Sequence, residues 1–160
     1  MRLGILSDTH DQLDRTKLAI RMLQELGAEV LAHCGDLTGP EIVAACAVMP
    51  CYFVFGNHDS DRVPDLRRAA ADTGAICLGW GAEISLAGKR IALAHGHMHT
   101  DIRCLLVTQP DFLFSGHSHI AADSREGPTR RINPGALHDA ETFTVALVDL
   151  ATDEVQFLSV

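Results

Sequence analysis

Residues 2–10 read Arg-Leu-Gly-Ile-Leu-Ser-Asp-Thr-His, a short apolar run that ends in a carboxylate and an imidazole two positions apart. An apolar run of this length, closed by polar residues, predicts a buried strand. A helix is predicted directly after it, at residues 13–26, because leucine and methionine recur there at helical spacing and Gly27 ends the pattern. The strand, the polar cluster and the helix together are typical of an α/β fold.

The same order of strand and helix continues through the first half of the chain. Strands are predicted at residues 30–33 and 51–55, and helices at residues 40–48 and 63–72, the first of these with Pro40 in its opening turn. Strands that alternate with helices pair in parallel through crossover connections. We therefore expect parallel strands with helices packed against them.

After Gly74 the pattern changes to short strands. Residues 83–86 and 91–94 flank Ala-Gly-Lys, which is a hairpin signature. A helix is predicted at residues 101–107 and a strand at residues 112–115. The remaining strands, which we expect to be antiparallel, are predicted at residues 120–124, 130–132, 142–150 and 154–158. The whole pattern predicts a single mixed α/β domain over residues 1–160, with two packed sheets and helices outside.

The composition is that of a soluble globular protein, and it excludes several functions. The 160-residue chain is 47% hydrophobic, and its apolar runs are far shorter than the roughly 20 residues that span a bilayer. It shows no secretory signal, so we expect a cytoplasmic protein that binds no membrane. A net charge of −8 argues against strong binding to duplex nucleic acid, which needs Lys and Arg to neutralise phosphates. Five cysteines without metal-binding spacing predict free thiols rather than disulfides.

Polar clusters follow five of the apolar runs, and they carry the information on function. The clusters are Asp8-Thr9-His10, Gly35-Asp36, Gly56-Asn57-His58-Asp59, His95-Gly96-His97 and Gly116-His117-Ser118-His119. In an α/β sheet the ligand lies beyond the carboxyl ends of the strands, so one rim should gather all five clusters. Each cluster alone is typical of a turn or a helix cap. Together, such crowded carboxylates and imidazoles are costly unless divalent metal ions compensate them, so we predict a metal site.

In this order the clusters resemble the signature of the calcineurin-like metallophosphoesterase superfamily, which runs Asp-x-His, Gly-Asp, Gly-Asn-His-Asp/Glu, His and Gly-His-x-His. The short spacings and the Asn-Pro-Gly at residues 133–135 are similar to its small, single-domain YfcE-like branch. The resemblance extends from Arg2 to the final strands. It implies a four-layer αββα sandwich, with two mixed β-sheets flanked by helices and a metal site at the carboxyl-terminal rim of the strands. One departure is Ala136, where many relatives carry a serine, so a phosphate contact by that hydroxyl is lost.

The resemblance also implies a role for each residue of the site. Asp8, His10 and His119 would bind one metal ion, Asn57, His95 and His117 a second, and Asp36 both. His58 would lie beside the phosphate as general acid or as a stabiliser of the transition state, and Asp59 would either orient His58 or cap the following helix. His97 is a candidate for a place behind the ligands or for contact with the substrate, and it ranks below His95 as a ligand. His99 and His138 are expected at the surface or behind the ligands. Manganese is the first choice for the two ions, with nickel, iron, zinc or cobalt as alternatives.

These assignments predict a metal-dependent phosphoesterase, and more specifically a phosphodiesterase that acts on a small phosphoester. The ester would be hydrolysed by in-line attack of a hydroxide that bridges the two metal ions, without a covalent enzyme intermediate. The alternative is a metal-binding scaffold without turnover that binds protein partners. A dinucleotide-binding domain is excluded, because no Gly-x-Gly-x-x-Gly follows the first strand. The sequence leaves open the choice between monoester and diester, and whether the chain forms a homo-oligomer.

Overall fold

The computed structural model describes residues 1–160, which form two β-sheets and the helices that flank them. The first sheet has six strands in the order β11 (Glu154–Ser159), β10 (Thr144–Asp149), β1 (Arg2–Leu6), β2 (Val30–His33), β3 (Cys51–Phe53) and β4 (Ile76–Cys77). The second has five strands in the order β5 (Gly81–Leu86), β6 (Lys89–Ala94), β7 (Phe112–Phe114), β9 (Thr129–Asn133) and β8 (Ala122–Glu126). The helices are α1 (Leu13–Glu25), α2 (Pro40–Cys46), α3 (Val63–Thr73), α4 (His99–Val107) and the short 3-10 helix η1 (Asn57–Arg62). None of them has the length and apolar character that a bilayer crossing requires.

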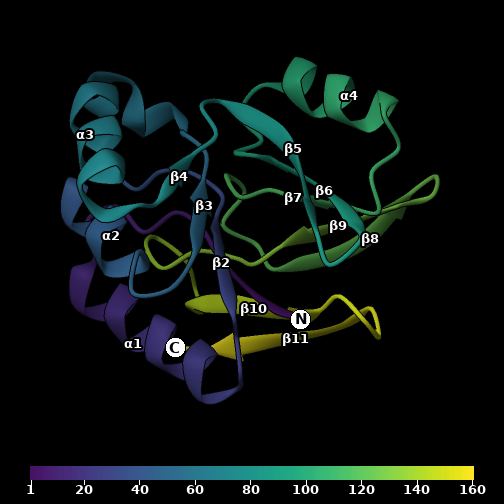
Figure 1. Cartoon of the computed structure of the whole chain (residues 1–160), viewed down its shortest axis with the longest axis horizontal. Coiled ribbons are helices and arrows are strands. Elements are labelled where there is room, and N and C mark those ends of the chain that lie inside the picture. Colours follow the sequence, from purple (N-terminus) through teal and green to yellow (C-terminus); the bar gives the residue numbers. More distant parts are fainter.

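The elements stack in four layers, with α1 to α3 on the outer face of the six-stranded sheet and α4 on the outer face of the five-stranded sheet (Figure 1). Three buried apolar clusters fill the three interfaces between these layers. The largest joins α1 to α3 with the first sheet and includes Leu23 and Leu66. The second lies between the sheets and includes Ile5 and Phe114, and the third packs Ile102 of α4 against the second sheet. The predicted αββα sandwich with two mixed sheets is therefore confirmed.

Strand β1 is covered by protein on both faces, which explains its unbroken apolar sequence. Leu3 and Ile5 pack into the interface between the sheets, whereas Leu6 packs into the interface with the helices. A Cβ atom on Gly4 would lie 2.8 Å from the side chain of Leu31 and 2.9 Å from that of Leu23 in α1. The helix therefore packs directly against the backbone of β1, as a doubly covered strand allows.

Strand pairing aligns the carboxyl ends of the strands that precede the polar clusters. Strands β1, β2 and β3 are parallel, and their registers place Leu6, His33 and Phe53 side by side. In the second sheet β6 and β7 are also parallel, with Leu93 opposite Phe114. The loops that follow these five strands therefore leave each sheet in a common direction, and the contacts between the loops bring them to one rim.

The predicted elements are confirmed with small shifts at their ends, and the exceptions have physical reasons. The helix predicted at residues 40–48 ends at Cys46, and the strand predicted at 120–124 lies at Ala122–Glu126. Strand β9 is antiparallel to β8 as expected, but the expectation is wrong for its other edge, which pairs in parallel with β7. The β8–β9 hairpin permits this, because it returns the chain to the direction of β7. Strand β4 is too short to leave a sequence pattern, and η1 depends on contacts from Asp59 described below.

Candidate metal centre

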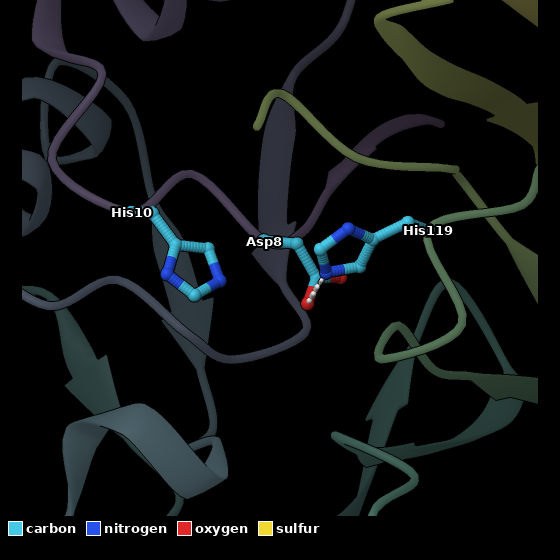
Figure 2. Close-up of side chains that lie close together, drawn as sticks. All are labelled: Asp8, His10 and His119. Atoms are coloured by element: carbon cyan, nitrogen blue, oxygen red, sulfur yellow. Dashed lines mark ion pairs between the residues drawn. The ribbon is translucent and has the colours of Figure 1, made fainter. Parts of the chain in front are cut away.

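The side chains predicted to bind metal gather at the rim formed by both sheets. Asp8 and His10 follow β1, Asp36 follows β2, Asn57 follows β3, His95 follows β6, and His117 and His119 follow β7. In Figure 2, Asp8 and His119 point toward each other although they lie far apart in the sequence, and His10 lies beside them. Five loops therefore contribute to one centre, as the positions of the clusters predicted.

Asp8 presents one carboxylate oxygen to the centre and uses the other to hold a neighbouring loop. Its Oδ2 accepts a hydrogen bond of 3.0 Å from the backbone N–H of His117. Its Oδ1 lies 3.2 Å from Nε2 of His119 and 3.9 Å from Nε2 of His95. The side chain is fully buried. One oxygen is thus fixed by the protein, and the other faces the imidazoles.

Asp36 is arranged in the same way between two imidazoles. Its Oδ1 accepts a hydrogen bond of 2.9 Å from the backbone N–H of His58. Its Oδ2 lies 3.4 Å from Nε2 of His10 and 3.3 Å from Nε2 of His95. An oxygen in this place can reach cations on either side of it, which a bridging ligand must do.

The ring of His95 is oriented by a backbone carbonyl. Its Nδ1 lies 2.8 Å from the carbonyl oxygen of Cys34, so the Nδ1–H donates there and Nε2 is left to face the centre. A metal-binding histidine typically donates its second ring N–H in this way, which fixes both the tautomer and the direction of the ring. Nε2 lies 3.1 Å from Oδ1 of Asn57. Asn57 and His95 are therefore neighbours, as predicted.

The electrostatics of the centre favour added positive charge. Burial raises the pKa of Asp36, but the nearby imidazoles of His10 and His95 outweigh burial and hold that pKa well below its usual range. The carboxylate of Asp36 in turn raises the pKa of His10. Burial lowers the pKa of His95, and Asp36 and Asp8 raise it by more than burial lowers it. The buried carboxylates thus attract positive charge, which either protons on the imidazoles or divalent cations can supply.

Among the predicted ligands, Oδ1 of Asp8 and Nε2 of His10 are buried polar atoms without a hydrogen-bond partner, and Oγ of Ser7 and Nδ1 of His97 beside the centre also lack one. Buried polar atoms are rarely left unpaired unless an ion or water completes them. Two compact groups of potential ligand atoms share Asp8, one with His10 and His119 and the other with Asp36 and His95. Within each group the ligand atoms lie within 4.8 Å of one another. Nitrogen and oxygen donors without thiolate suit divalent ions of the first transition row, so these residues fit a metal centre.

The last two predicted ligands lie beside these groups rather than within them. Asn57 contacts Nε2 of His95, and the ring of His117 lies with its centre 5.1 Å from that of His95. Both therefore belong to the side of the centre that His95 occupies. The structure places Asp8 on that side as well, which the resemblance did not imply.

Five of the seven predicted ligands have a left-handed backbone conformation. The φ angles are 53° for Asp8, 40° for His10, 57° for Asp36, 69° for His117 and 59° for His119. This conformation costs residues other than glycine about 1–2 kcal/mol each, and such strain concentrates at functional sites. The fold therefore holds the ligands in place at the expense of stability.

Glycines let these strained loops approach one another closely. A Cβ atom at Gly56 would collide with the carboxylate of Asp36, and one at Gly116 would collide with Ser7 and with Oδ2 of Asp8. These glycines therefore serve close packing of the loops around the two carboxylates.

Asp59 is fully buried and ties two of the loops together. Its Oδ2 accepts hydrogen bonds from the backbone N–H groups of Asp36 at 2.9 Å and Gly56 at 2.7 Å. Its Oδ1 accepts one from the N–H of Thr38 at 2.8 Å. Asp59 therefore caps η1, the short helix in which it lies, and not the helix that follows, because α3 has Arg62 at its N-cap and no side-chain capping bond. Its hydrogen bonds go to backbone N–H groups and not to the ring of His58.

His33 supports the same loop from within β2, a role that its sequence context did not indicate. The backbone N–H of Gly35 donates to Nδ1 of His33 at 3.2 Å, so Nε2 carries the ring proton and donates to the hydroxyl of Thr9 at 3.1 Å. That hydroxyl in turn donates to the backbone carbonyl of Asp36. Complete burial lowers the pKa of His33 to about 3, so the ring is neutral at pH 7.

Three of the four remaining histidines lie around the centre, whereas His99 is exposed at the start of α4, as one of the two expectations for it had it. The ring of His58 is exposed, with its centre 5.0 Å from that of His10. The ring of His138 lies on the same imidazole, with centres 4.8 Å apart, and that of His97 lies 5.4 Å from His95. His138 and His97 thus lie directly behind or beside the predicted ligands.

Comparison with known proteins agrees with this geometry. A family model described as the calcineurin-like phosphoesterase superfamily domain matches residues 1–153. Phosphodiesterase MJ0936 of Methanocaldococcus jannaschii is 24% identical over 144 residues, which are 84% of this chain and 83% of that protein. Phosphodiesterase YfcE of Escherichia coli K12 is 26% identical over 152 residues, which are 86% of this chain and 79% of that protein.

Solved structures share the fold along the whole chain. A structure of an archaeal phosphodiesterase superposes with a TM-score of 0.90 at 22% identity, and the match covers 100% of both chains. Vps29 of Entamoeba histolytica superposes with a TM-score of 0.65 at 18% identity, covering 100% of this chain and 98% of that one. At these identities the likeness concerns the fold alone.

Proposed function

The chain belongs to the calcineurin-like phosphoesterase superfamily, and we propose that it is a metal-dependent phosphodiesterase that hydrolyses a small phosphoester. One observation carries the proposal. The free carboxylate oxygens of Asp8 and Asp36 face imidazoles from several loops within one buried centre, where two of the predicted ligand atoms lack a partner. The names of the relatives in Methanocaldococcus jannaschii and Escherichia coli support the choice of a diester.

Each predicted ligand has a place in this proposal. Asp8, His10 and His119 would hold one divalent ion, Asn57, His95 and His117 a second, and Asp36 would reach both. Divalent ions held by these residues would supply an activated water as nucleophile and would neutralise charge on the phosphate oxygens during in-line attack. Manganese is our first choice among the ions that suit these donors, followed by nickel, iron, zinc and cobalt.

The charges of the centre suit an anionic substrate. Two carboxylates, one neutral amide and four neutral imidazoles leave a pair of divalent ions with an excess of about two positive charges. This local charge attracts a phosphate although the protein as a whole carries a charge of −8. The ions' own charge decides the local field, because it lies within a few ångströms of the bound group.

His58 is the residue to which we assign contact with the leaving group. Its backbone N–H is held by Asp36, so the residue stays at the centre, while its ring is exposed beside His10. From this place a protonated imidazole can donate its proton to the leaving oxygen or stabilise charge on the phosphate. Because the ring is free of bonds to the protein, it can follow the substrate.

The test is hydrolysis of bis(p-nitrophenyl) phosphate by chelator-stripped protein to which manganese, nickel, zinc, cobalt or magnesium is added singly. We expect turnover to return with at least one metal and to be lost in Asp36→Asn. Asp61→Asn is the matched control, because Asp61 is an exposed acid that makes no ion pair and is not among the predicted ligands. Tight metal binding without hydrolysis of any diester or monoester would refute the proposal and favour the scaffold.

A further inference from the structure

The loop between β4 and β5 places Trp80 at the rim of the metal centre. It is the one tryptophan of the chain, and 43% of its surface is exposed. Its neighbours in space come from the ends of β3 and β6, the strands that lead to Asn57 and His95. A single exposed apolar side chain on a protein surface needs no explanation, but a large aromatic ring beside a polar catalytic centre does.

The indole is held firmly on its inner side. It packs edge-on against Phe55, with ring centres 5.4 Å apart and an interplanar angle of 66°, and Phe55 is completely buried. The backbone N–H of Phe55 also donates a hydrogen bond of 2.7 Å to the carbonyl of Gly79, next to Trp80. The ring is therefore fixed by the core on one side and open to solvent on the other, which is the arrangement of a preorganised contact surface.

A continuous set of rings connects Trp80 to the metal centre. The ring centre of His97 lies 6.1 Å from that of Trp80, and it also lies 5.4 Å from His95 and 6.2 Å from His117. The rings of Trp80 and His97 meet at an angle of 59° and so form a corner beside the predicted ligands. Two aromatic rings that meet in a corner offer a flat, polarizable surface on which a planar ring can stack.

We propose that Trp80 and His97 form a subsite for a planar aromatic group of the substrate, so that the phosphoester hydrolysed at the metal centre carries a nucleobase. This rests on the proposed function, because it places the ester's phosphate on the metal centre. The base stacks on the open face of the indole, and the sugar spans the distance to the phosphate. Stacking selects a ring but not a particular base, because every base offers a flat face.

The other phenylalanines and the tyrosine offer no free ring at the centre. The guanidinium of Arg15 covers the ring of Phe143, and Tyr52 packs against the cluster between the sheets. Phe53, Phe55, Phe112 and Phe114 are all buried in the core. Phe157 is exposed by 37%, but it lies in β11 at the far edge of the first sheet. It therefore provides a matched control for Trp80.

The experiment uses the fluorescence of the single tryptophan in zinc-loaded protein, since Zn²⁺ has no redox chemistry. The protein is titrated with adenosine 5′-monophosphate, with ribose 5-phosphate and with phenyl phosphate, and each affinity is also measured by calorimetry. We expect saturable quenching by the adenosine nucleotide and none by ribose 5-phosphate. Quenching by phenyl phosphate at equal affinity would assign the subsite to aryl groups instead of nucleobases, and would overturn that part of the proposal.

Substitutions separate stacking from a structural role of the indole. Trp80→Ala should weaken the binding of adenosine 5′-monophosphate by about 5- to 150-fold and leave the affinity for ribose 5-phosphate unchanged. Trp80→Phe and Phe157→Leu should change neither affinity by more than a few-fold. Equal affinity of the wild type for the two ligands, or equal weakening of both in Trp80→Ala, would overturn the proposal. Ring-dependent quenching without hydrolysis of any ester would refute the proposed activity and leave the subsite standing.

Discussion

Asp59 connects the loop of Asp36 to the loop of Asn57, so replacing its carboxylate by an amide should weaken both the fold and the centre. In Asp59→Asn one oxygen remains as an acceptor, while the new NH₂ group faces a backbone donor. A hydrogen bond to a charged group contributes about 1.5–3 kcal/mol, and at least one of the three backbone bonds is lost. Burial raises the pKa of Asp59, which means that its charge is costly, and the amide recovers part of that cost. We expect a net loss of about 1–3 kcal/mol in the free energy of unfolding.

Urea unfolding of chelator-stripped protein at pH 7 measures this loss directly. Asp61→Asn, which removes an exposed carboxylate from the same 3-10 helix, should change the free energy of unfolding by less than about 0.5 kcal/mol. Calorimetric titration with Mn²⁺ should show affinity about 10- to 100-fold weaker in Asp59→Asn, because residues that hold ligands in place affect metal binding on that scale. A variant that keeps both the stability and the metal affinity of the wild type would refute the positioning role of Asp59.

Three further predictions follow from the same contacts. His33 takes up a proton in the unfolded chain near pH 6.5 but in the folded chain only near pH 3. The free energy of unfolding should therefore fall by up to about 1.4 kcal/mol per pH unit as pH drops through this window. Urea unfolding at pH 7, 6 and 5 should show a smaller pH dependence in His33→Gln, and equal slopes in both proteins would contradict the burial of a neutral ring. Gly56→Ala should lower metal affinity at least tenfold, because the new Cβ would displace the carboxylate of Asp36. Unchanged affinity by calorimetry would contradict the close approach of Gly56 to that carboxylate. A divalent ion at 100 times its Kd should raise the free energy of unfolding by about 2.7 kcal/mol and the Tm by roughly 5–10 °C. A chelator should reverse this shift in Tm, and the shift should be smaller in His119→Ala. A Tm that does not depend on metal would contradict the proposed centre.

The sequence predicted the layers and the rim because these depend on patterns that single residues carry. Strand β1 is apolar from Leu3 to Leu6 because both of its faces are covered there, whereas Arg2 at its start is exposed. The cluster at Asp8 follows because a ligand site needs polar residues where the strand ends. The spacing of leucines gave α1 within one residue of its observed end. These features are local, so they are visible without the partners that pack against them.

The parts that sequence did not predict depend on contacts between distant segments. Asp59 and His33 have the composition of an ordinary turn and strand, and only the folded chain brings their side chains to the backbone around Asp36. The left-handed backbone at Asp36 and His117 is likewise imposed by neighbouring loops, since neither residue prefers it. The sharing of Asp8 between two groups of ligand atoms depends on where five loops meet, which no spacing encodes.

The number of metal ions bound per chain tests the central claim most directly. Chelator-stripped protein is titrated with Mn²⁺ by calorimetry, and the bound metal is counted by mass spectrometry after gel filtration. We predict two ions per chain, one lost in His119→Ala, the other lost in His117→Ala, and both weakened in Asp36→Asn. Binding of one ion or none by the wild type, or loss of the same ion in both histidine variants, would contradict a centre built from two metal ions around Asp36.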